Sequence, residues 1–586
     1  MRIRHSVLVC SLLLALSAQP AEPPAAPEVV RGPLGRKLDD YLSRLEKFGF
    51  SGAVIVARNG EVVLSKGYGL ADRERNLPFT PQTVASTGSI TKQFTAAAIL
   101  KLEMQGKLKV EDSISKYFPD VPEDKKAITL HHLLTHTAGF RGDFGGRDDD
   151  PIGRDDLVRR VLEAPLEAPR GEHYEYSNEG YSLLGAIVEI VSGLPYEEYL
   201  AKNLFEPAGM TQTGYRRPDW SSATVAVGYT DEGRWGTILG RGWREDGPGW
   251  YLRANGGIQS TAEDMHRWHR ALEGDQMLSV EAKKKLFAPH VKEDPSGRSH
   301  YGYGWAIFTT PRGTRLVTHN GGNGIFAADF MRFVDEGVVI YAHTNAPLMA
   351  YDFSSDLAAL VFGSPVEPPP AVVALDPKDV ARFVGTYELA SGERFSLTAG
   401  ESQLQVTDIP GPLFAQLMDL QPARDAALAP AVERTRRLIQ EGARGNYEAV
   451  QKVLGGRMPP EEVEANEGRI WKMRRQQFGE FQGVEILGAA DRGVAVVVYA
   501  RLRFEREVRI ARYVWRGDDF DGVRPGGGPG TARFLPTAPT EFAAFTLRPR
   551  ATVRLSFELK KDGSVAGLMF ISGKSTVTAR PVAAKN

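Results

Sequence analysis

Ser89-Ile90-Thr91-Lys92 lies in an alanine-rich run that extends from Val84 to Leu100. Alanine favours helix, and the apolar residues of the run are spaced so that they can share one side of a helix. A serine and a lysine three residues apart then lie one turn apart on the same face. A serine hydroxyl is a weak nucleophile until a neighbouring group takes its proton. The pattern therefore predicts that Lys92 takes the proton of Ser89 or stabilises the group that does.

Ser-x-x-Lys alone is a weak signal, because about one or two copies are expected by chance in a chain of this length and ordinary composition. A second copy, Ser113-Ile-Ser-Lys116, is present. It leads into Tyr-Phe-Pro119, where proline closes the segment because it cannot continue a helix. We interpret the second copy as a surface turn, and we expect the copy at Ser89 to have partners elsewhere in the chain.

The first residues have the pattern of a secretory signal. Arg2 and Arg4 precede a short apolar run, Ser6 to Leu16, which small residues follow. We predict a signal peptide over residues 1–21, with a buried N-terminal helix as the alternative. The run is shorter than the roughly 20 residues that span a bilayer as a helix, so no transmembrane anchor is expected. Residues 22–33 are rich in proline, alanine and glutamate and are expected to form a disordered linker.

The composition is that of an ordinary globular protein. Of the 586 residues, 42% are hydrophobic and 25% are charged, and the length predicts several domains or one large domain with additions. With 72 basic and 73 acidic residues, the chain lacks the basic excess that nucleic acid or an anionic membrane surface would attract. The only cysteine, Cys10, lies in the predicted signal. Export without disulfides suits a bacterial periplasm or cell surface, so a periplasmic or extracellular location is expected.

An antiparallel pair of strands is expected before the serine helix. Residues 34–50 have the pattern of an amphipathic helix. Two strand-like runs, 51–57 and 61–65, then flank Asn59-Gly60, which is a typical two-residue hairpin turn.

Two later stretches could supply partners for Ser89. Tyr176 and Asn178 stand two residues apart in an extended or turning segment, so both can point into one cleft. His319 ends a predicted strand just before Gly321 and Gly322, which allow another backbone to approach closely. A strand edge of this kind beside a serine helix is a natural place for an oxyanion hole. Taken singly, a core tyrosine, a capping asparagine and a histidine in a hairpin turn remain the alternatives.

His132 and His136 have the i, i+4 spacing of a helical metal site within a predicted short helix, residues 128–137. The stretch supplies neither an acidic residue in the position of a general base nor an evident third ligand. We therefore interpret the two histidines as packing or capping residues, and we expect no metal site.

Ser89-Ile-Thr-Lys92, Tyr176-Ser-Asn178 and His319-Asn-Gly321, in this order, resemble the three motifs of the serine β-lactamase and penicillin-binding-protein superfamily. The Tyr-x-Asn motif is closer to the class C β-lactamase-like branch, peptidase family S12. The resemblance covers residues 34–363, and four further stretches look like that branch: 133–139, 204–211, 255–262 and 301–305. It implies a β-lactamase-like α+β or α/β fold, in which an antiparallel sheet is flanked by a helical subdomain.

The resemblance also implies roles for individual residues. Ser89 would be the acylated nucleophile, and Tyr176 would act as general base, with Lys92 lowering the proton affinity of its neighbours. Asn178 would bind the amide of the substrate. The backbone N–H groups of Ser89 and Gly322 would form the oxyanion hole.

His319 stands where β-lactamases of this superfamily carry the lysine of a Lys-Thr-Gly motif. Bringing a tyrosine from a pKa of about 10 to about 7 requires roughly 4 kcal/mol, and one cation at about 4 Å supplies about that much. We therefore expect Lys92 to lower the pKa of Tyr176 largely by itself. A neutral His319 would hold a substrate carboxylate less firmly than lysine does.

This difference favours some substrates over others. The sequence predicts an exported serine hydrolase that acts through an acyl-enzyme on a small-molecule or peptide substrate, with no cofactor. A peptide of D-amino acids, a peptidoglycan fragment and an ester are the expected substrate classes. A β-lactamase is the first alternative, and a penicillin-binding sensor or scaffold that turns over poorly is the second. Residues 240–251, a glycine-rich loop with Trp243, Trp250 and Tyr251, could wall the pocket.

The C-terminal third is expected to form separate domains. A proline-rich linker at 365–374 follows the hydrolase domain, 34–364. Alternating strands in 375–425 and 531–586 resemble the lipocalin-like β-barrel that follows many hydrolases of this branch. Two helices and a curved sheet in 426–530 look like a nuclear-transport-factor-like α+β cone inserted into the barrel, with 525–530 as its exit linker.

Overall fold

The computed structural model describes residues 28–140, 148–230, 233–346, 350–400, 402–421, 425–453, 460–493, 495–525, 533–547, 550–573 and 575–582. The predicted signal peptide, most of the first linker and residues 526–530 of the predicted exit linker lie outside these ranges. Within them, no helix has both the length and the apolar character needed to cross a membrane.

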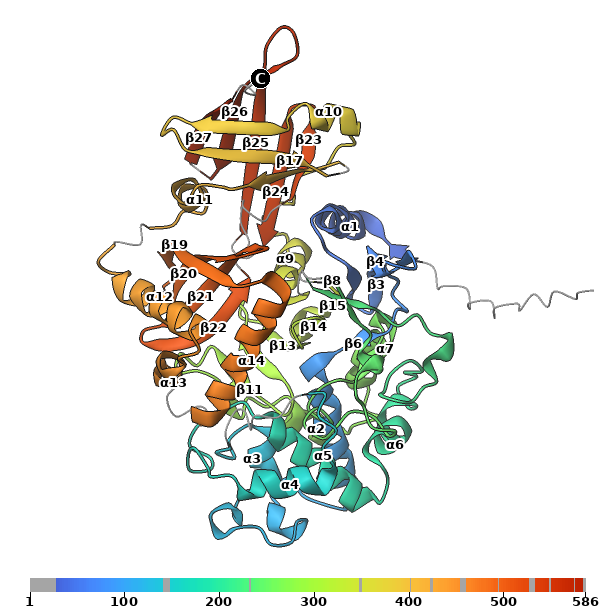
Figure 1. The fold of residues 1–586 in the computed structure, drawn as a ribbon. Helices are drawn as coiled ribbons and strands as arrows, with labels where there is room; N and C mark the ends of the chain where they lie inside the picture. The colour runs from blue at the N-terminus through green and yellow to red at the C-terminus, as the bar shows by residue number, and fades with distance from the viewer. Residues whose placement is uncertain are drawn as a thin grey trace, which may run out of the picture.

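A nine-stranded antiparallel sheet forms the centre of the N-terminal part (Figure 1). Its strands are, in spatial order, β1 (Val29–Val30), β3 (Glu61–Tyr68), β2 (Gly52–Arg58), β15 (Val338–Thr344), β14 (Ala327–Phe333), β13 (Arg315–Gly322), β12 (Ala306–Thr309), β11 (Ser299–Tyr301) and β10 (Val291–Lys292). Asn59 and Gly60, both with positive φ, join β2 to β3 in the predicted hairpin turn.

Residues 29–30 correct the prediction of a disordered linker over 22–33. They pair with Ser65 and Leu64 of β3 and form the edge strand β1. The next helix, α1 (Gly32–Lys47), also begins inside the predicted linker. Its second residue is Pro33, and proline is well tolerated at a helix start because the first N–H groups have no intrahelical partner. Free backbone groups on the edge of β3 therefore order a segment that composition marked as disordered.

Helices cover both faces of the sheet. On one face, α1 and α9 (Ala350–Val361) pack on apolar side chains of β2, β14 and β15. The opposite face packs against the helical subdomain, which contains α2 (Thr91–Met104), α3 (Leu130–Leu134), α4 (Arg154–Glu163), α5 (Asn178–Ser192), α6 (Tyr196–Leu200), α7 (Ala262–Glu273) and α8 (Val280–Leu286). The helix α2 is buried along nearly its whole length, so it runs through the interior rather than over the surface.

The C-terminal part contains a closed antiparallel barrel of eight strands: β16 (Gly385–Leu389), β17 (Arg394–Ala399), β18 (Leu404–Thr407), β23 (Arg533–Ala538), β24 (Glu541–Leu547), β25 (Arg550–Leu559), β26 (Val565–Ser572) and β27 (Ser575–Pro581). Aromatic rings, including Phe383, Phe395 and Phe557, are buried in its core. Phe545 and Leu547 of β24 pack with α1 and α9, so the barrel rests on the outer helical layer of the sheet (Figure 1).

Between β18 and β23 the chain leaves the barrel and forms a second unit. A four-stranded sheet, β19 (Phe481–Asp491), β20 (Val496–Phe504), β21 (Val508–Arg516) and β22 (Asp519–Pro525), packs against α12 (Ala429–Ala443), α13 (Glu448–Val453) and α14 (Pro460–Phe478). Trp471 and Trp515 are buried in its core. The helix α11 (Gly411–Leu417) and the strand β22 were not predicted. The predicted fold class, a flanked antiparallel sheet followed by a barrel with an α+β insertion, is confirmed.

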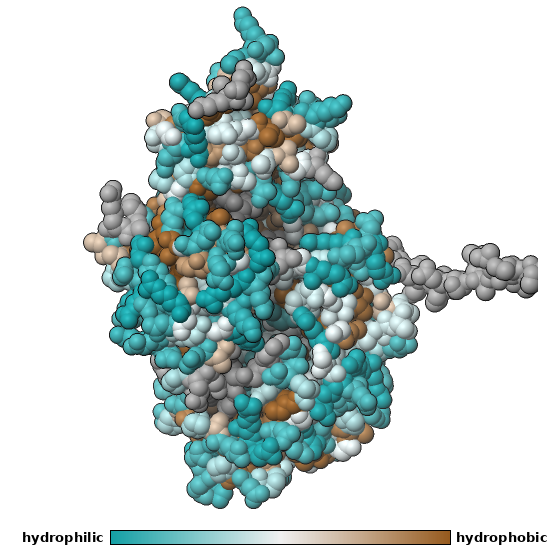
Figure 2. Space-filling view, in the orientation of Figure 1, coloured by the Kyte–Doolittle hydropathy of each residue, from teal (hydrophilic) through white to brown (hydrophobic). Residues whose placement is uncertain are grey.

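The face of the molecule seen in Figure 2 is mostly hydrophilic, and its apolar residues lie in separate patches. This is the usual pattern for a surface that faces water.

Two glycine-containing segments meet where the sheet touches α2. The end of β13 lies against the 3-10 turn Gly88–Ile90, which leads into α2. A Cβ atom added at Gly321 would lie 2.1 Å from the carbonyl oxygen of Thr87 and 2.5 Å from the backbone nitrogen of Ser89. A Cβ atom at Gly88 would lie 2.3 Å from the backbone nitrogen of Gly322. Only glycine fits at both positions.

We predict that Gly321→Ala separates the two backbones and lowers the free energy of unfolding by about 1–3 kcal/mol, the usual cost of overpacking. Urea unfolding of the full chain measures the change. Gly274→Ala is the matched control, because a Cβ atom there meets nothing within 4 Å and its φ is −78°. Equal stability of Gly321→Ala and the control would contradict the prediction.

Candidate active site

Ser89 lies in the 3-10 turn just before α2, and Lys92 lies in the first turn of that helix. The strand β6 (Ala85–Ser86) pairs with β9 (Gln259–Ser260) and leads directly into this turn. Lys92 has no solvent-exposed surface, whereas Ser89 is only half-buried. The reactive hydroxyl therefore faces an open hollow while the ammonium group beside it is shielded from water.

Three oxygen atoms surround the side-chain nitrogen of Lys92. Nζ lies 3.3 Å from Ser89 Oγ, 2.8 Å from Asn178 Oδ1 and 2.9 Å from the carbonyl oxygen of Asn255. Burial lowers the pKa of Lys92 to about 7, and the carboxylates of Glu179 and Asp148 oppose this shift. Near pH 7, a substantial fraction of Lys92 is therefore neutral and able to accept a proton.

Tyr176 lies close to both Lys92 and the ring of His136. The rings of Tyr176 and His136 are stacked, with centroids 4.4 Å apart, and Lys92 Nζ lies 4.6 Å from the centroid of Tyr176. Burial raises the pKa of Tyr176, a hydrogen bond with Ser89 lowers it, and the charge of Glu293 raises it further. The expected lowering of this pKa by Lys92 is therefore wrong. Burial disfavours the phenolate, and the same burial removes part of the positive charge on Lys92.

The segment that carries Tyr176 and Asn178 is anchored by a histidine. The backbone N–H of Ser177 donates a hydrogen bond to His136 Nδ1, at 3.0 Å, and the hydroxyl of Ser177 caps α5 by accepting from Gly180. Asn178 is the first residue of α5, and its side chain reaches Lys92.

His132 and His136 do not act as a pair. His132 completes a capping box with Thr129 at the start of α3, whereas His136 lies beyond the helix with a φ of 57°. These contacts agree with the packing and capping interpretation. Throughout the described ranges, no group of three or more histidine, cysteine, aspartate or glutamate residues is arranged to hold a metal ion.

His319 lies on β13, within the buried edge of the site. Its Nδ1 is 2.5 Å from the carbonyl oxygen of Asn320, and its Nε2 is 3.0 Å from the hydroxyl of Tyr301. Burial and the charge of Lys92 lower the pKa of His319 to about 4. His319 is therefore neutral at pH 7, donating from Nδ1 to the carbonyl and accepting the Tyr301 hydroxyl hydrogen at Nε2.

The structure places Gly321 and Gly322 beside the serine. A Cβ atom added at Gly321 or Gly88 would collide with the facing backbone, so the two segments pack closely. The N–H groups of Ser89 and Gly322 thus come from two segments that only glycine allows to meet. Two backbone donors from neighbouring segments are the kind of groups that an oxyanion hole uses.

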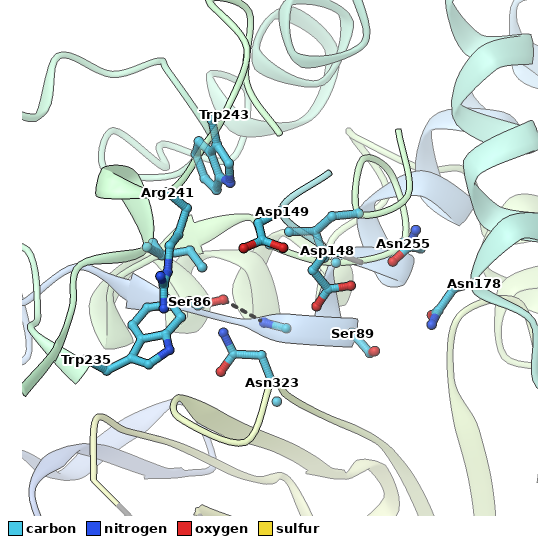
Figure 3. Close-up of a pocket in the computed structure, with 16 residues that line it drawn as sticks. Ser86, Ser89, Asp148, Asp149, Asn178, Trp235, Arg241, Trp243, Asn255 and Asn323 are labelled. Carbon is cyan, nitrogen blue, oxygen red and sulfur yellow. Dashed lines mark hydrogen bonds between the residues drawn. The ribbon is translucent and has the colours of Figure 1, made fainter. Parts of the chain in front are cut away.

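Two hollows meet at Ser89. The first has a volume of about 300 Å³ and is lined by Asn178, Asp148, Asp149 and the loop that carries Arg241 and Trp243 (Figure 3). The guanidinium carbon of Arg241 lies 3.4 Å from the ring centroid of Trp235. All three aromatic residues of this loop belong to the hydrophobic core, and Trp243 also lines the hollow as the sequence suggested, whereas Trp250 and Tyr251 do not.

The second hollow has a volume of about 530 Å³ and lies on the other side of the serine. Its lining includes Tyr174, Tyr176, Glu293, Tyr301, His319 and Tyr351.

The structure brings all seven predicted site residues together and adds others that sequence reasoning missed. The additions are His136, Asp148, Asn255, Glu293 and Tyr301. Asn255 and Tyr301 begin two of the stretches that resembled the superfamily, so a signal for these two was present. Asp148 and Glu293 stand in unremarkable polar segments, where only the folded chain reveals their position.

Comparisons with known proteins agree with the fold. The Beta-lactamase family model matches residues 38–361. Penicillin-binding protein 4* of Bacillus subtilis is 28% identical over 421 residues, which cover 68% of this chain and 92% of that protein. PbpX of the same organism is 35% identical over 272 residues, covering 46% of this chain and 65% of that protein. The chain thus spans a little under two thirds of PbpX and nearly all of penicillin-binding protein 4*.

Among solved structures, the octameric penicillin-binding protein homologue from Pyrococcus abyssi matches 93% of this chain and all of its own, with a TM-score of 0.53 and 20% identity. At this level of identity the match concerns the fold alone. The family model covers more than half of the 586 residues, including every candidate site residue. The chain therefore belongs to the Beta-lactamase family, within the superfamily of serine hydrolases that contains β-lactamases and penicillin-binding proteins.

Proposed function

We propose that this protein hydrolyses peptide or ester bonds through an acyl-enzyme at Ser89, as a peptidase or esterase related to family S12. The observation that carries the proposal is the buried Lys92, whose Nζ lies 3.3 Å from Ser89 Oγ and whose pKa is near 7. A neutral amine at this distance can take the serine proton as the hydroxyl attacks a carbonyl carbon.

The remaining residues are assigned to the steps around this attack. The N–H groups of Ser89 and Gly322 would stabilise the oxyanion, and Asn178 would bind an amide of the substrate. Tyr176, with a raised pKa, is assigned a different part from the phenolate base expected from the sequence. As a neutral hydroxyl it would pass a proton from Lys92 to the departing alcohol or amine. Water then attacks the acyl-enzyme and releases the acid.

The electrostatics favour an ester, or a peptide of D-amino acids without a carboxylate beside the cleaved bond, over a β-lactam. A β-lactam carries a carboxylate that the family lysine usually binds, and His319 stands in that place as a neutral ring. A penicillin-binding protein that releases its acyl group slowly is the second candidate function. It is favoured by the names of the two Bacillus subtilis relatives, both of which are called penicillin-binding proteins. Peptidoglycan fragments remain candidate substrates. We further propose export to the periplasm or cell surface through the signal at residues 1–21.

We predict that a fluorophosphonate labels wild type but not Ser89→Ala, as followed by intact mass over time. Ser113→Ala, in the second Ser-x-x-Lys copy, is the matched control and should label like wild type, because Ser113 only caps an exposed turn. Equal labelling of Ser89→Ala would remove Ser89 as the nucleophile. Treatment with a penicillin then separates the alternatives. A penicillin adduct that clears quickly indicates a β-lactamase, and an adduct that persists indicates a slow penicillin-binding protein. The absence of any adduct indicates an esterase or peptidase.

We also predict that kcat/KM for a neutral ester falls as the pH is lowered through about 7. Lys92 must be neutral to accept the serine proton, and its pKa of about 7 means that protonation below this value removes the base. The expected profile rises about tenfold per pH unit well below 7 and levels off above 8. A rate that stays constant between pH 5.5 and 8 would rule out Lys92 as the proton acceptor.

A further inference from the structure

The second hollow beside Ser89 combines aromatic rings with one carboxylate. We call it the tyrosine–glutamate cavity, after Tyr174, Tyr176, Tyr301, Tyr351 and Glu293. These residues come from the loop before α5, from β11, from the start of α9 and from the residue after β10. With a volume of about 530 Å³, the cavity is large enough for a small organic group.

Glu293 is held in place by neutral donors. The hydroxyl of Tyr174 donates to Oε1 at 3.1 Å, and the hydroxyl of Ser299 donates to Oε2. Within the described part of the chain, no lysine or arginine forms an ion pair with Glu293, and none lines the cavity. His319, which also lines it, is neutral at pH 7. Burial raises the pKa of Glu293, whereas the hydrogen bonds from Ser299 and Tyr174 and the charge of His300 lower it. At pH 8, far above the ordinary carboxyl range, the group is ionised and gives the cavity a negative potential.

That potential reaches the reacting groups. The charge of Glu293 contributes to the raised pKa of Tyr174, Tyr176 and Tyr301. A negative charge that disfavours a phenolate at these positions would attract a cation placed between them. Tyrosine ring faces attract alkylammonium groups in the same way, because the π-electrons make each face negative.

The position of Tyr176 identifies which part of the substrate the cavity would hold. Tyr176 lines the tyrosine–glutamate cavity and is absent from the lining of the first hollow, whereas Asn178 lines only the first. The departing alcohol or amine must receive a proton, and Tyr176 is the hydroxyl assigned to deliver it. The leaving group therefore belongs on the Tyr176 side, and the acyl group on the Asn178 side.

We propose that the tyrosine–glutamate cavity is a leaving-group subsite that selects esters or amides whose departing group carries an alkylammonium. This inference rests on the proposed function of Ser89. The tyrosine rings and Glu293 would surround the cation. The attack of Ser89 on the carbonyl carbon would be the same as for an uncharged leaving group. A leaving group with a carboxylate would meet Glu293 without a compensating cation and would be disfavoured.

The test compares three thioesters that differ in the charge of the departing thiol: acetylthiocholine, its neutral isostere 3,3-dimethylbutyl thioacetate, and S-acetyl-3-mercaptopropionate. Thiol release at pH 8 and low salt gives kcat/KM for each. We expect wild type to prefer acetylthiocholine over the neutral isostere by about tenfold or more, and to process the anionic ester most slowly. Glu293→Gln should reduce the cation preference to about one- to threefold, whatever its rate on the neutral ester.

Asp294→Asn is the matched control, since it removes the same charge from the neighbouring, exposed residue. It should keep the wild-type preference. The subsite is overturned if wild type has a kcat/KM for acetylthiocholine no higher than for the neutral isostere. It is also overturned if the ratio of these two values is the same in Glu293→Gln and wild type. A betaine thioester of 3,3-dimethylbutanethiol places the ammonium on the acyl side instead. If this ester raises kcat/KM more than acetylthiocholine does, the proposal is also overturned.

Two further measurements separate the subsite from the proposed function and from misfolding. If Ser89→Ala releases no thiol and wild type shows no preference for the cationic ester, the proposed hydrolase function stands and the subsite is rejected. No Ser89-dependent turnover of any ester would reject both. In wild type, choline should inhibit hydrolysis of the neutral ester competitively and more strongly than 3,3-dimethyl-1-butanol. Equal inhibition by the two alcohols would contradict the proposal without any variant.

Discussion

The approach of the glycine end of β13 to the turn that carries Ser89 is the constraint on which the rest of the site depends. Any Cβ at Gly88 or Gly321 would collide with backbone across this contact. The contact joins the central sheet to the buried helix α2, and it brings the backbone segments that carry Ser89 and Gly322 together. Sheet packing and the candidate oxyanion hole therefore have the same physical origin.

Burial is the second constraint, and it acts in opposite directions on the two groups beside Ser89. Loss of water disfavours the charged form of each, so the pKa of Lys92 falls towards 7 and the pKa of Tyr176 rises. Near pH 7 the lysine is therefore the group available to accept a proton, because the tyrosine keeps its own. The same burial keeps His319 neutral, which leaves the substrate-facing cavity beside it with a carboxylate and no lysine or arginine among the described lining residues. The proposed preference for substrates other than a β-lactam therefore rests on charge more than on shape.

The barrel is joined to the hydrolase domain by a mixed contact. Phe545 packs on Phe48, and Asp356 of α9 accepts hydrogen bonds from Tyr41 of α1 and Arg550 of β25. The barrel therefore rests on α1 and α9, which cover the face of the sheet opposite to α2. Its own core is filled by packed aromatic side chains. These features describe a domain held in a defined position beside the hydrolase, and the domain boundaries drawn from the sequence remain predictions.

Local sequence determined much of this protein. Asn59-Gly60 specified the β2–β3 hairpin, alternation indicated the barrel strands, and α14 corresponds to one of the two helices predicted within 426–530. The three short motifs, with the glycine that follows the third, identified seven residues that do lie together, because each motif combines a functional side chain with the local backbone that presents it. The prediction failed at residues 29–30, where pairing with a distant strand ordered a segment of disordered composition.

Tertiary structure alone decided the properties that depend on many distant groups. Protonation of Lys92 and Tyr176 depends on how much water the folded chain excludes, which no local pattern encodes. Glu293 stands more than 100 residues after Tyr176, and nothing in its own segment marks it. Its place in the cavity follows from the pairing of β10 with β11 and the packing of Tyr174 against that edge. Sequence motifs could therefore identify the reacting groups, whereas the charge that surrounds them is a property of the assembled fold.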